Sequence, residues 1–371
     1  MIYLDHAATT PVRQEVIETM LPYFSDCFAN ASGSYASARQ ARRAMDQART
    51  QLAQAIGAQR TEVYFTSGGS ESDNRALFGA VRASKKRRIV TTGIEHHAIL
   101  EACHALEVMG YEIAYAQTDS SGRVWPEAIR SIMTEDTALV SVMLANNEVG
   151  TIQPVAEIAA VAHEFGALMH TDAVQAVGHI PVNVAELGVD LLSLSAHKFG
   201  GPKGVGALYV RSGVKLGNLI YGGAQEKGMR AGTENLPGIV GMGKAMQLAQ
   251  EAMPVAARRV KALRDQLEEE LVSQIPGVRV NGDRENRLPG HLHISIADMD
   301  ANLLLMRLDM EGIAASSASA CAAGAMERSH VIRAMGIDGE NQADLRLTLG
   351  EDNTKEEIEK TVCALKRILL K

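Results

Sequence analysis

The segment Asp190–Gly206 carries the residue best suited to covalent chemistry. It reads DLLSLSAHKFGGPKGVG, in which an apolar stretch ends at Lys198 and a glycine-rich turn follows. An ammonium group at the end of a buried strand is costly unless it is exposed, paired or used covalently. A lysine in this place can form a Schiff base with an aldehyde cofactor such as pyridoxal phosphate. The same pattern also suits a lysine that caps the strand in solvent.

Asp172 ends an upstream apolar stretch, ALMHTDAVQ, and Gln175 follows three residues later. A carboxylate beside a pyridinium nitrogen keeps that nitrogen protonated, which makes the ring an electron sink. Taken alone, Asp172 is explained more simply as the N-cap of a helix.

The segment Thr66–Glu71 reads TSGGSE and lies between a predicted strand and a predicted helix. Small residues allow backbone N–H groups to close on a phosphate at a helix N-terminus. The segment lacks the G-K-[ST] ending of a P-loop, which argues against a nucleotide triphosphate. A capped turn without a ligand accounts for it equally well.

His96 and His97 follow a short β-type stretch. An imidazole there can stack on an aromatic cofactor or move protons near neutral pH. The alternative is a metal site that also uses Cys103 and His104. Their spacing is a poor match to the i, i+4 ligands of metal-binding helices, and we predict no metal site.

Cys321 stands in a run of small residues, SSASACAAGAMERSH, over Ser316–His330. Few of these side chains can build a core, so the run predicts a mobile loop. A cysteine on such a loop is a good nucleophile when its pKa is lowered, and an inert thiol is the alternative. The four cysteines form no C-x-x-C pair and no disulfide scaffold, and their scatter indicates thiols in a reducing cytosol.

Short β-type runs alternate with helical patterns in the first two thirds of the chain. Strands are predicted at Val63–Thr66, Arg88–Thr92, Glu112–Ala116, Ala138–Leu144, Ala167–His170, Leu191–Ser195 and Val205–Val210. Helices are predicted between most of them. This order predicts a mostly parallel sheet covered on both faces, with functional groups at the carboxyl ends of the strands.

The pattern changes after about Gly232. Leu236–Met253 predicts one helix, Pro254 is expected to start a second, and QIPGVRVNGD then predicts a strand. We therefore predict an α/β fold with a large domain of residues 13–255, in which a mostly parallel mixed sheet lies between helices. Residues 1–12 and 256–371 are expected to form a smaller α+β domain that carries the cysteine loop.

Composition narrows the class of protein. The chain has 371 residues, of which 46% are hydrophobic, enough for a large core. Its 37 Lys and Arg residues against 44 Asp and Glu give a net charge of −7, which argues against direct nucleic-acid binding. The N-terminus does not resemble a secretory signal, and no apolar run reaches the ~20 residues needed to span a bilayer. We expect a cytoplasmic protein without membrane contact.

Taken together, these segments resemble the cysteine desulfurases of the NifS/IscS type, which are class V aminotransferase-like pyridoxal-phosphate enzymes of fold type I. The resemblance covers nearly the whole chain. It is carried by YLDHAATTP, TSGGSESDN, EHHAIL, NNEVG, HTDAVQAVG, SAHKFGGPKG, GGAQEKGMRAGT, SSASAC and LRLTLG, in that order.

The resemblance implies roles for the cofactor-binding residues. Lys198 matches the Schiff-base lysine, Asp172 the partner of the pyridinium nitrogen, and His96 the histidine that stacks on the ring. The positions that match those holding the phenolic oxygen are Asn147 and Gln175. The positions that match phosphate-binding residues are Ser70, Ser195, His197 and Thr233, the last reaching from the other subunit of a homodimer.

The resemblance also implies the reaction. Arg346 and Asn147 would bind the substrate carboxylate. Cys321 would accept sulfur from L-cysteine as a persulfide, leaving L-alanine. The sulfur would pass to an acceptor protein, either an iron–sulfur scaffold or a tRNA-thiolation enzyme.

Five positions depart from the family pattern: Ala31, Tyr35, Ala318, Arg328 and Glu351. They leave the cofactor residues and the nucleophile intact, and they put the identity of the sulfur acceptor in question. The alternatives are selenocysteine lyase, a class V transaminase, or a non-enzymatic sulfur carrier that has inherited the fold.

Overall fold

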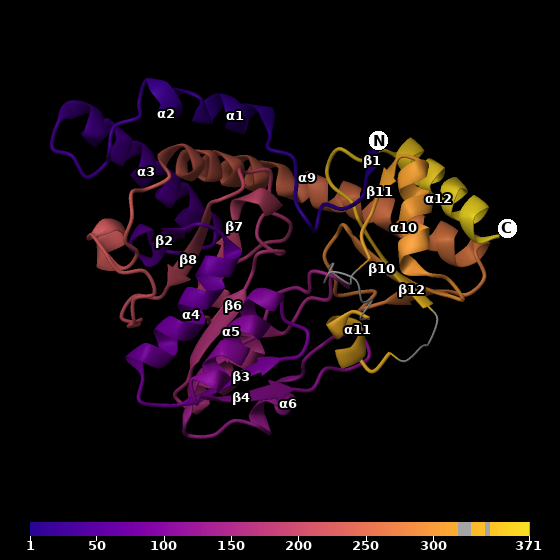
Figure 1. Cartoon of the computed structure of the whole chain (residues 1–371), viewed down its shortest axis with the longest axis horizontal. Coiled ribbons are helices and arrows are strands. Elements are labelled where there is room, and N and C mark those ends of the chain that lie inside the picture. Colours follow the sequence, from indigo (N-terminus) through magenta and orange to yellow (C-terminus); the bar gives the residue numbers. More distant parts are fainter. Residues whose placement is uncertain (318–327, 338–341, 371) are drawn as a thin grey trace.

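A mixed sheet forms the centre of the larger part of the molecule (Figure 1). The computed structural model describes residues 1–317, 328–337 and 342–370. Within these ranges the sheet has seven strands, in the spatial order β2 (Val63–Thr66), β8 (Gly206–Val210), β7 (Leu191–Ser195), β6 (Leu168–Asp172), β5 (Thr137–Ser141), β3 (Arg88–Thr92) and β4 (Glu112–Ala116). β8 runs antiparallel to both of its neighbours, and the remaining pairs are parallel. The predicted α/β class is confirmed.

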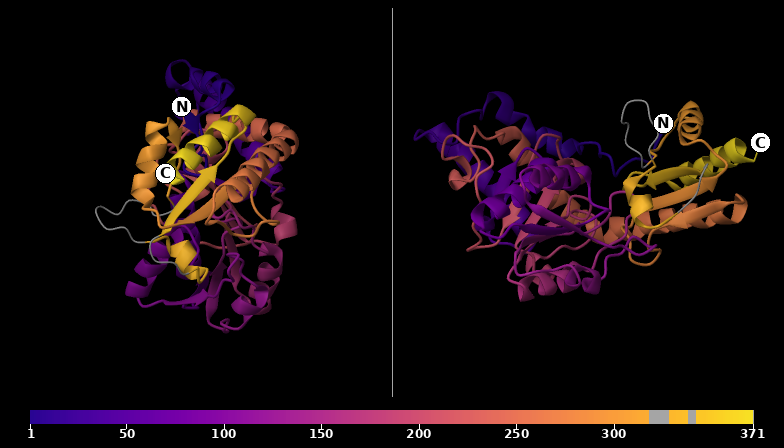
Figure 2. Two further views of the ribbon diagram at one scale, coloured as in Figure 1. Left: turned by 90° about the vertical axis from the view of Figure 1, so that its right-hand side faces the viewer. Right: turned by 60° about the horizontal axis from the view of Figure 1, so that its bottom comes forward.

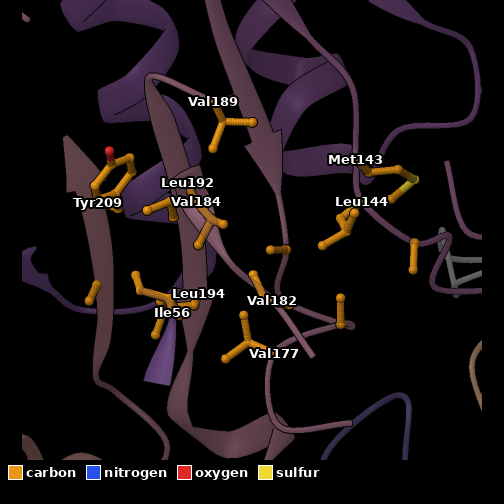
Figure 3. Close-up of a cluster of buried hydrophobic side chains, with 14 of the residues drawn as sticks. Ile56, Met143, Leu144, Val177, Val182, Val184, Val189, Leu192, Leu194 and Tyr209 are labelled. Atoms are coloured by element: carbon orange, nitrogen blue, oxygen red, sulfur yellow. The ribbon is translucent and has the colours of Figure 1, made fainter. Parts of the chain in front are cut away.

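Helices cover both faces of this sheet. In the larger part they are α1 (Gln14–Met20), α2 (Pro22–Ser25), α3 (Ala36–Ala55), α4 (Gly69–Ala83), α5 (His97–Val108), α6 (Pro126–Arg130), α7 (Val155–Glu164) and α8 (Val184–Leu187), with short 3-10 turns η1 (Arg60–Glu62), η2 (Ala196–Lys198) and η3 (Gln225–Gly228). Ile89 and Leu139 pack in a cluster with α4 and α5, whereas Val90 and Val140 belong to the core that contains residues of α3 and α7. This alternation follows from the two-residue period of a strand. Figure 3 shows part of the latter core, the large core, with Leu192 of β7 and Tyr209 of β8 among its aliphatic neighbours.

The face under α4 becomes polar toward the carboxyl ends of the strands. Ser141, His170 and Ser193 are fully buried there, and Asp172 and Ser195 are nearly so. They alternate with apolar residues that enter the opposite core, so they share one side of the sheet. The sheet therefore presents buried polar groups where the strands end.

Two predicted strand ends are wrong. β5 ends at Ser141 rather than Leu144. Val142 and Leu144 still donate to carbonyls of β6, but the N–H of Met143 donates to the Glu95 carboxyl group, 3.1 Å from each oxygen, instead of to β3. β6 extends to Asp172, two residues beyond the predicted end at His170.

The smaller part has a separate sheet and core, and Figure 2 shows it beside the larger part. Its antiparallel strands are β9 (Val278–Asn281), β10 (His291–Ala297) and β12 (Gln342–Thr348), with helices α10 (Ala301–Met310) and α12 (Lys355–Leu369). The short helix α11 (His330–Ala334) instead packs Val331 and Ile332 into the core of the larger part. The N-terminal strand β1 (Ile2–Tyr3) pairs in parallel with β11 (Ile313–Ala314), and Leu4 lies in the second core with Leu292 and Leu345. The residue limits of the two domains stay a prediction.

The predicted helix break at Pro254 is wrong. α9 (Leu236–Gln274) is one helix that runs through Pro254 and extends from the larger part into the smaller one (Figure 1). A proline inside a helix removes one hydrogen bond and costs about 3 kcal/mol. Each half of α9 has its own anchor, since Ile239 and Met246 pack in the large core and Leu267 and Leu271 in the second core. Tertiary packing therefore outweighs the local preference.

Among the helices of residues 1–317, 328–337 and 342–370, none combines the length and the apolar character that a membrane span requires.

A buried ion pair ties α3 to η3. Arg49 Nη1 and Nη2 lie 2.6 and 2.7 Å from the two carboxylate oxygens of Glu226, and both side chains are buried. Arg49 also donates to Val63 O at 2.7 Å, and Phe65 N donates to Glu226 at 2.9 Å. Both charges thus have partners, and removing one would leave the other buried and uncompensated.

We expect Glu226→Gln to lower the free energy of unfolding by about 3–5 kcal/mol, since it leaves the Arg49 charge unpaired. The double variant Arg49→Met/Glu226→Gln should lose less than the sum of the two single variants. Urea denaturation measures both. The control is Glu164→Gln, which breaks an exposed pair with Arg130 and should leave the free energy of unfolding nearly unchanged. Equal losses in Glu226→Gln and Glu164→Gln would contradict the prediction.

Candidate active site

Lys198 follows β7 directly, in the turn η2. Its Nζ donates to Ala8 O at 3.0 Å and also to Ala7 O, both in the N-terminal segment. Its own carbonyl accepts a hydrogen bond of 2.8 Å from His179 Nε2. The amine is therefore held at the carboxyl end of the sheet, where the sequence predicts functional groups.

The surroundings of Lys198 favour its neutral form. Burial lowers the pKa of Lys198 to about 8, and the nearby Arg346 charge adds to this effect. The carboxylates of Asp172 and Asp5 oppose it. A larger share of this amine is neutral near pH 7 than of an ordinary lysine, as a nucleophilic or proton-accepting lysine requires.

Asp172 and His96 lie close enough to interact electrostatically with each other and with Lys198. Asp172 is buried and accepts a hydrogen bond of 2.9 Å from Val174 N. Burial raises the pKa of Asp172, while His96, Val174 N–H and Lys198 counteract the rise. His96 caps α5 by accepting from Ala98 N at 3.1 Å, and the loss of hydration around it lowers its pKa, which favours a neutral ring.

The N-terminal segment lies along the site. Gln175 Nε2 donates to Ala7 O at 3.0 Å, and His197 Nδ1 lies 3.1 Å from Thr9 Oγ1. Burial, followed by the charge of Lys198, lowers the pKa of His197 to about 4, so this ring is neutral. Three residues predicted for the site are thus tied to one segment.

Arg346 reaches the site from β12 of the smaller part. Its Nη2 pairs with Asp5 Oδ1 at 2.8 Å, and its Nη1 donates to Asn147 O at 3.0 Å. Within the described ranges, Arg346 Nε and Asn147 Oδ1 are buried without a hydrogen-bond partner. Buried polar atoms are normally satisfied, so these two mark a place where a polar ligand can bind.

The turn before α4 packs tightly against β8. A Cβ on Gly206 would lie 2.7 Å from Gly68 Cα, so a side chain there would push the turn away. Ser195 lies beneath the turn, 3.8 Å from where a Cβ on Gly69 would be. Ser70 is exposed in the first turn of α4, whose leading N–H groups lack partners within the helix and attract an anion.

The structure does not join every predicted residue to this site. Thr233 is exposed before α9, and in the described part of the chain no hydrogen bond links it to Lys198 or Ser195. Cys321 and Ala318 lie outside the described residues. The chain leading toward them starts beside Arg346, since the backbones of Ser316 and Arg346 exchange hydrogen bonds of 2.7 and 3.3 Å.

Charged departures from the family pattern have partners. Arg328 donates to the Asp344 carboxylate at 3.2 Å, and Glu351 pairs with Arg13. Ala31 is buried in the large core. These contacts are structural and do not involve the lysine.

The alternative metal site is not formed by the described residues. Among them, no group of three or more His, Cys, Asp and Glu side chains could hold a metal ion. Cys103 is fully buried and burial raises its pKa to about 12, whereas the His104 side chain faces solvent.

Sequence reasoning missed the part played by Asp5 and the carbonyls of Ala7 and Ala8. The signal is a polar run, DHAATT, directly after a short apolar start. Its partners Arg346 and Lys198 lie far along the chain, so only the fold shows the contact.

Known proteins resemble this chain over nearly its whole length. The model of the family described as aminotransferase class-V matches residues 2–361. A cysteine desulfurase IscS from Dictyoglomus turgidum is 48% identical over 373 aligned residues, which cover 100% of this chain and 95% of the relative. A solved NifS-like protein superposes with a TM-score of 0.94 at 38% identity, covering 100% of this chain and 99% of that one. The structure described as SspA in complex with cysteine has a TM-score of 0.83 at 34% identity, covering 95% of this chain and 100% of that one. The chain belongs to the class V aminotransferase family.

Proposed function

We propose that this chain is a pyridoxal-phosphate-dependent cysteine desulfurase, which removes sulfur from L-cysteine and releases L-alanine. The observation that carries the proposal is the placement of Lys198, with its lowered pKa, in one site with Asp172 and Arg346. Full-length relatives named cysteine desulfurases support it, as does the similar structure that holds cysteine.

The residues present fit the phosphate and the ring hydroxyl of pyridoxal phosphate. The phosphate would bind at the N-terminus of α4 with Ser70, Ser195 and the neutral His197. Asn147, whose Oδ1 is buried without a partner among the described residues, would hold the ring hydroxyl with Gln175. The glycine turn leaves no room for a side chain between itself and β8, and the first N–H groups of α4 lack partners within the helix, so an anion can bind there.

The ring and the aldehyde also have suitable partners. Asp172 would face the ring nitrogen, His96 would lie on the ring, and Lys198 would meet the aldehyde. When bound, pyridoxal phosphate supplies an aldehyde that condenses with amines and a ring that withdraws electrons from the α-carbon.

The side chains of this protein position the substrate and move its protons. Arg346 would bind the cysteine carboxylate, using the unpartnered Nε and the planar fork that suits a carboxylate. Lys198, when neutral, would take the α-proton and return a proton to the product. Asp5 holds the Arg346 fork in place through its ion pair.

Cys321 would take up the sulfur. Its thiolate attacks the substrate sulfur, so an S–S bond forms while the C–S bond breaks, and the electron pair of the C–S bond stays with carbon. Protonation of that carbon leads to alanine, and the transferred sulfur remains on Cys321 as a persulfide. We propose that it then passes to an acceptor protein, either an iron–sulfur scaffold or a tRNA-thiolation enzyme, in the reducing cytoplasm.

The lowered pKa of Lys198 makes cofactor uptake dependent on pH. After removal of pyridoxal phosphate, the rate of its rebinding should rise about tenfold per pH unit below pH 8 and level off above it, because only the neutral amine condenses with the aldehyde. Visible absorbance after rapid mixing measures the rate. A rate that keeps rising to pH 10 would show an ordinary lysine. Lys198→Ala serves as the control and should give no covalent signal.

Replacing Cys321 tests the sulfur transfer. Cys321→Ser should retain the visible absorbance of the cofactor. Its rate of alanine formation should fall at least 100-fold, which corresponds to a rise of about 2.7 kcal/mol in the activation free energy. Mass spectrometry should detect the added sulfur on the parent protein and not on the variant. Cys363→Ser, which changes an exposed cysteine on α12, is the control. Undiminished sulfur release from Cys321→Ser would rule out the persulfide mechanism.

We also propose that the protein is a homodimer. Large apolar side chains are exposed on and around α1 and α2, where Leu21, Phe24 and Phe28 are 58, 64 and 73% exposed. Such a concentration of apolar surface is typical of a protein interface. Thr233, which no hydrogen bond ties to the site within the described part of its own chain, would complete the phosphate site of the partner.

Phe24→Asp/Phe28→Asp should convert the dimer to a monomer of 39.8 kDa, because carboxylates would be buried at the interface. Light scattering coupled to size exclusion measures the mass. The control Met306→Asp/Met310→Asp alters equally exposed residues on α10 and should stay dimeric. A monomeric parent protein, or a dimeric Phe24→Asp/Phe28→Asp variant, would refute this interface.

A further inference from the structure

A second buried carboxyl group lies behind Asp172. Asp73 is on α4, is 1% exposed, and points to the sheet face that also carries His170 and Asp172. Its Oδ1 lies 3.7 Å from His170 Nε2 and has no hydrogen-bond partner among the described residues. The side chain therefore sits in the same layer as Asp172, away from solvent.

Asp73 has no cation to balance a negative charge. In the described ranges no lysine or arginine pairs with it, whereas Asp172 interacts with Lys198 and His96. The other groups that act on Asp73 are the Ser193 hydroxyl and the carboxyls of Asp172 and Glu95. An isolated buried carboxylate is costly, and two neighbouring carboxylates do not readily ionise together.

A chain of hydroxyls and one imidazole connects Asp73 to the centre of the sheet. His170 Nε2 lies 3.0 Å from Ser193 Oγ, and His170 Nδ1 lies 2.8 Å from Ser141 Oγ. The Ser193 hydroxyl also acts on Asp73, in the direction that lowers the pKa of the Asp73 carboxyl group. His170 is fully buried, and burial lowers its pKa to about 3, so it is a neutral imidazole with one donor and one acceptor nitrogen.

A neutral imidazole allows two directions for this chain, and the protonation state of Asp73 decides between them. With a proton on Asp73, its O–H donates to Ser193, the Ser193 hydroxyl donates to His170 Nε2, and Nδ1–H donates to Ser141. Each of these contacts is then satisfied, and no net charge is buried behind Asp172.

We propose that Asp73 is a positioning residue that remains a neutral carboxylic acid behind Asp172, held by Ser193, His170 and Ser141. Asp172 is then the carboxylate of the pair that carries the charge facing Lys198 and His96. Burial and then the Asp172 charge raise the pKa of Asp73, and the smaller opposing effect of the Ser193 hydroxyl does not reverse this rise. What the Asp172 charge is used for rests on the proposed function, whereas the protonation of Asp73 does not.

Infrared spectroscopy of the cofactor-loaded protein tests the assignment directly. At neutral pH the parent protein should show the carbonyl stretch of a protonated carboxyl group that is lost in Asp73→Asn and kept in Asp172→Asn. Glu95, whose pKa burial raises to about 8, contributes a separate band, which Glu95→Gln identifies. No band difference between the parent and Asp73→Asn, or a band lost only in Asp172→Asn, would overturn the proposal.

A second variant keeps the test open if Asp73→Asn does not fold. Ser193→Ala leaves the acid in place and removes the hydroxyl that receives its proton, so the Asp73 band should move in frequency. A band that does not move overturns the hydrogen-bond chain. The spectrum requires no turnover, so an inactive protein with the band contradicts the desulfurase proposal alone, and an active protein without it contradicts the Asp73 proposal alone.

Discussion

The N-terminal segment links the two parts of the candidate site. Asp5 pairs with Arg346 of the smaller part, while the carbonyls of Ala7 and Ala8 accept hydrogen bonds from Lys198 of the larger part. The strand β1 fixes one end of this segment by pairing with β11. The distance between Arg346 and Lys198 thus depends on the short segment from Asp5 to Ala8, which contacts both parts of the molecule.

Burial is the main cause of the unusual charge states in the site. It lowers the pKa of Lys198 and raises that of Asp172, so each group is moved toward its neutral form before its neighbours act. The opposite charges of Lys198 and Asp172 then partly reverse both shifts. Because desolvation and charge pairing oppose each other, a small change in nearby charge alters the protonation of Lys198 and Asp172.

The architecture supplies this environment by covering the carboxyl ends of the strands. The face of the sheet that packs against α4 carries apolar side chains early in β5, β6 and β7 and polar ones toward the ends of these three strands. α9 then connects the two cores without interruption, and its packing on both sides accounts for a helix that tolerates Pro254. The site lies between the large sheet and the smaller part, because Lys198 follows β7 of the large sheet and Arg346 is on β12 of the smaller part.

The sequence by itself determined the α/β class, most strand positions and the identity of the residues suited to the chemistry. Strand periodicity, glycine turns and the lysine after an apolar run are local signals, so they can be recognised without a fold. Only the tertiary structure decided that Asp5, Ala7 and Ala8 meet Arg346 and Lys198, that α9 continues through Pro254, and that Asp73 lies behind Asp172. These features depend on contacts between residues far apart in the chain and on burial, and neither the removal of water nor the partner of a charge can be recognised from local sequence.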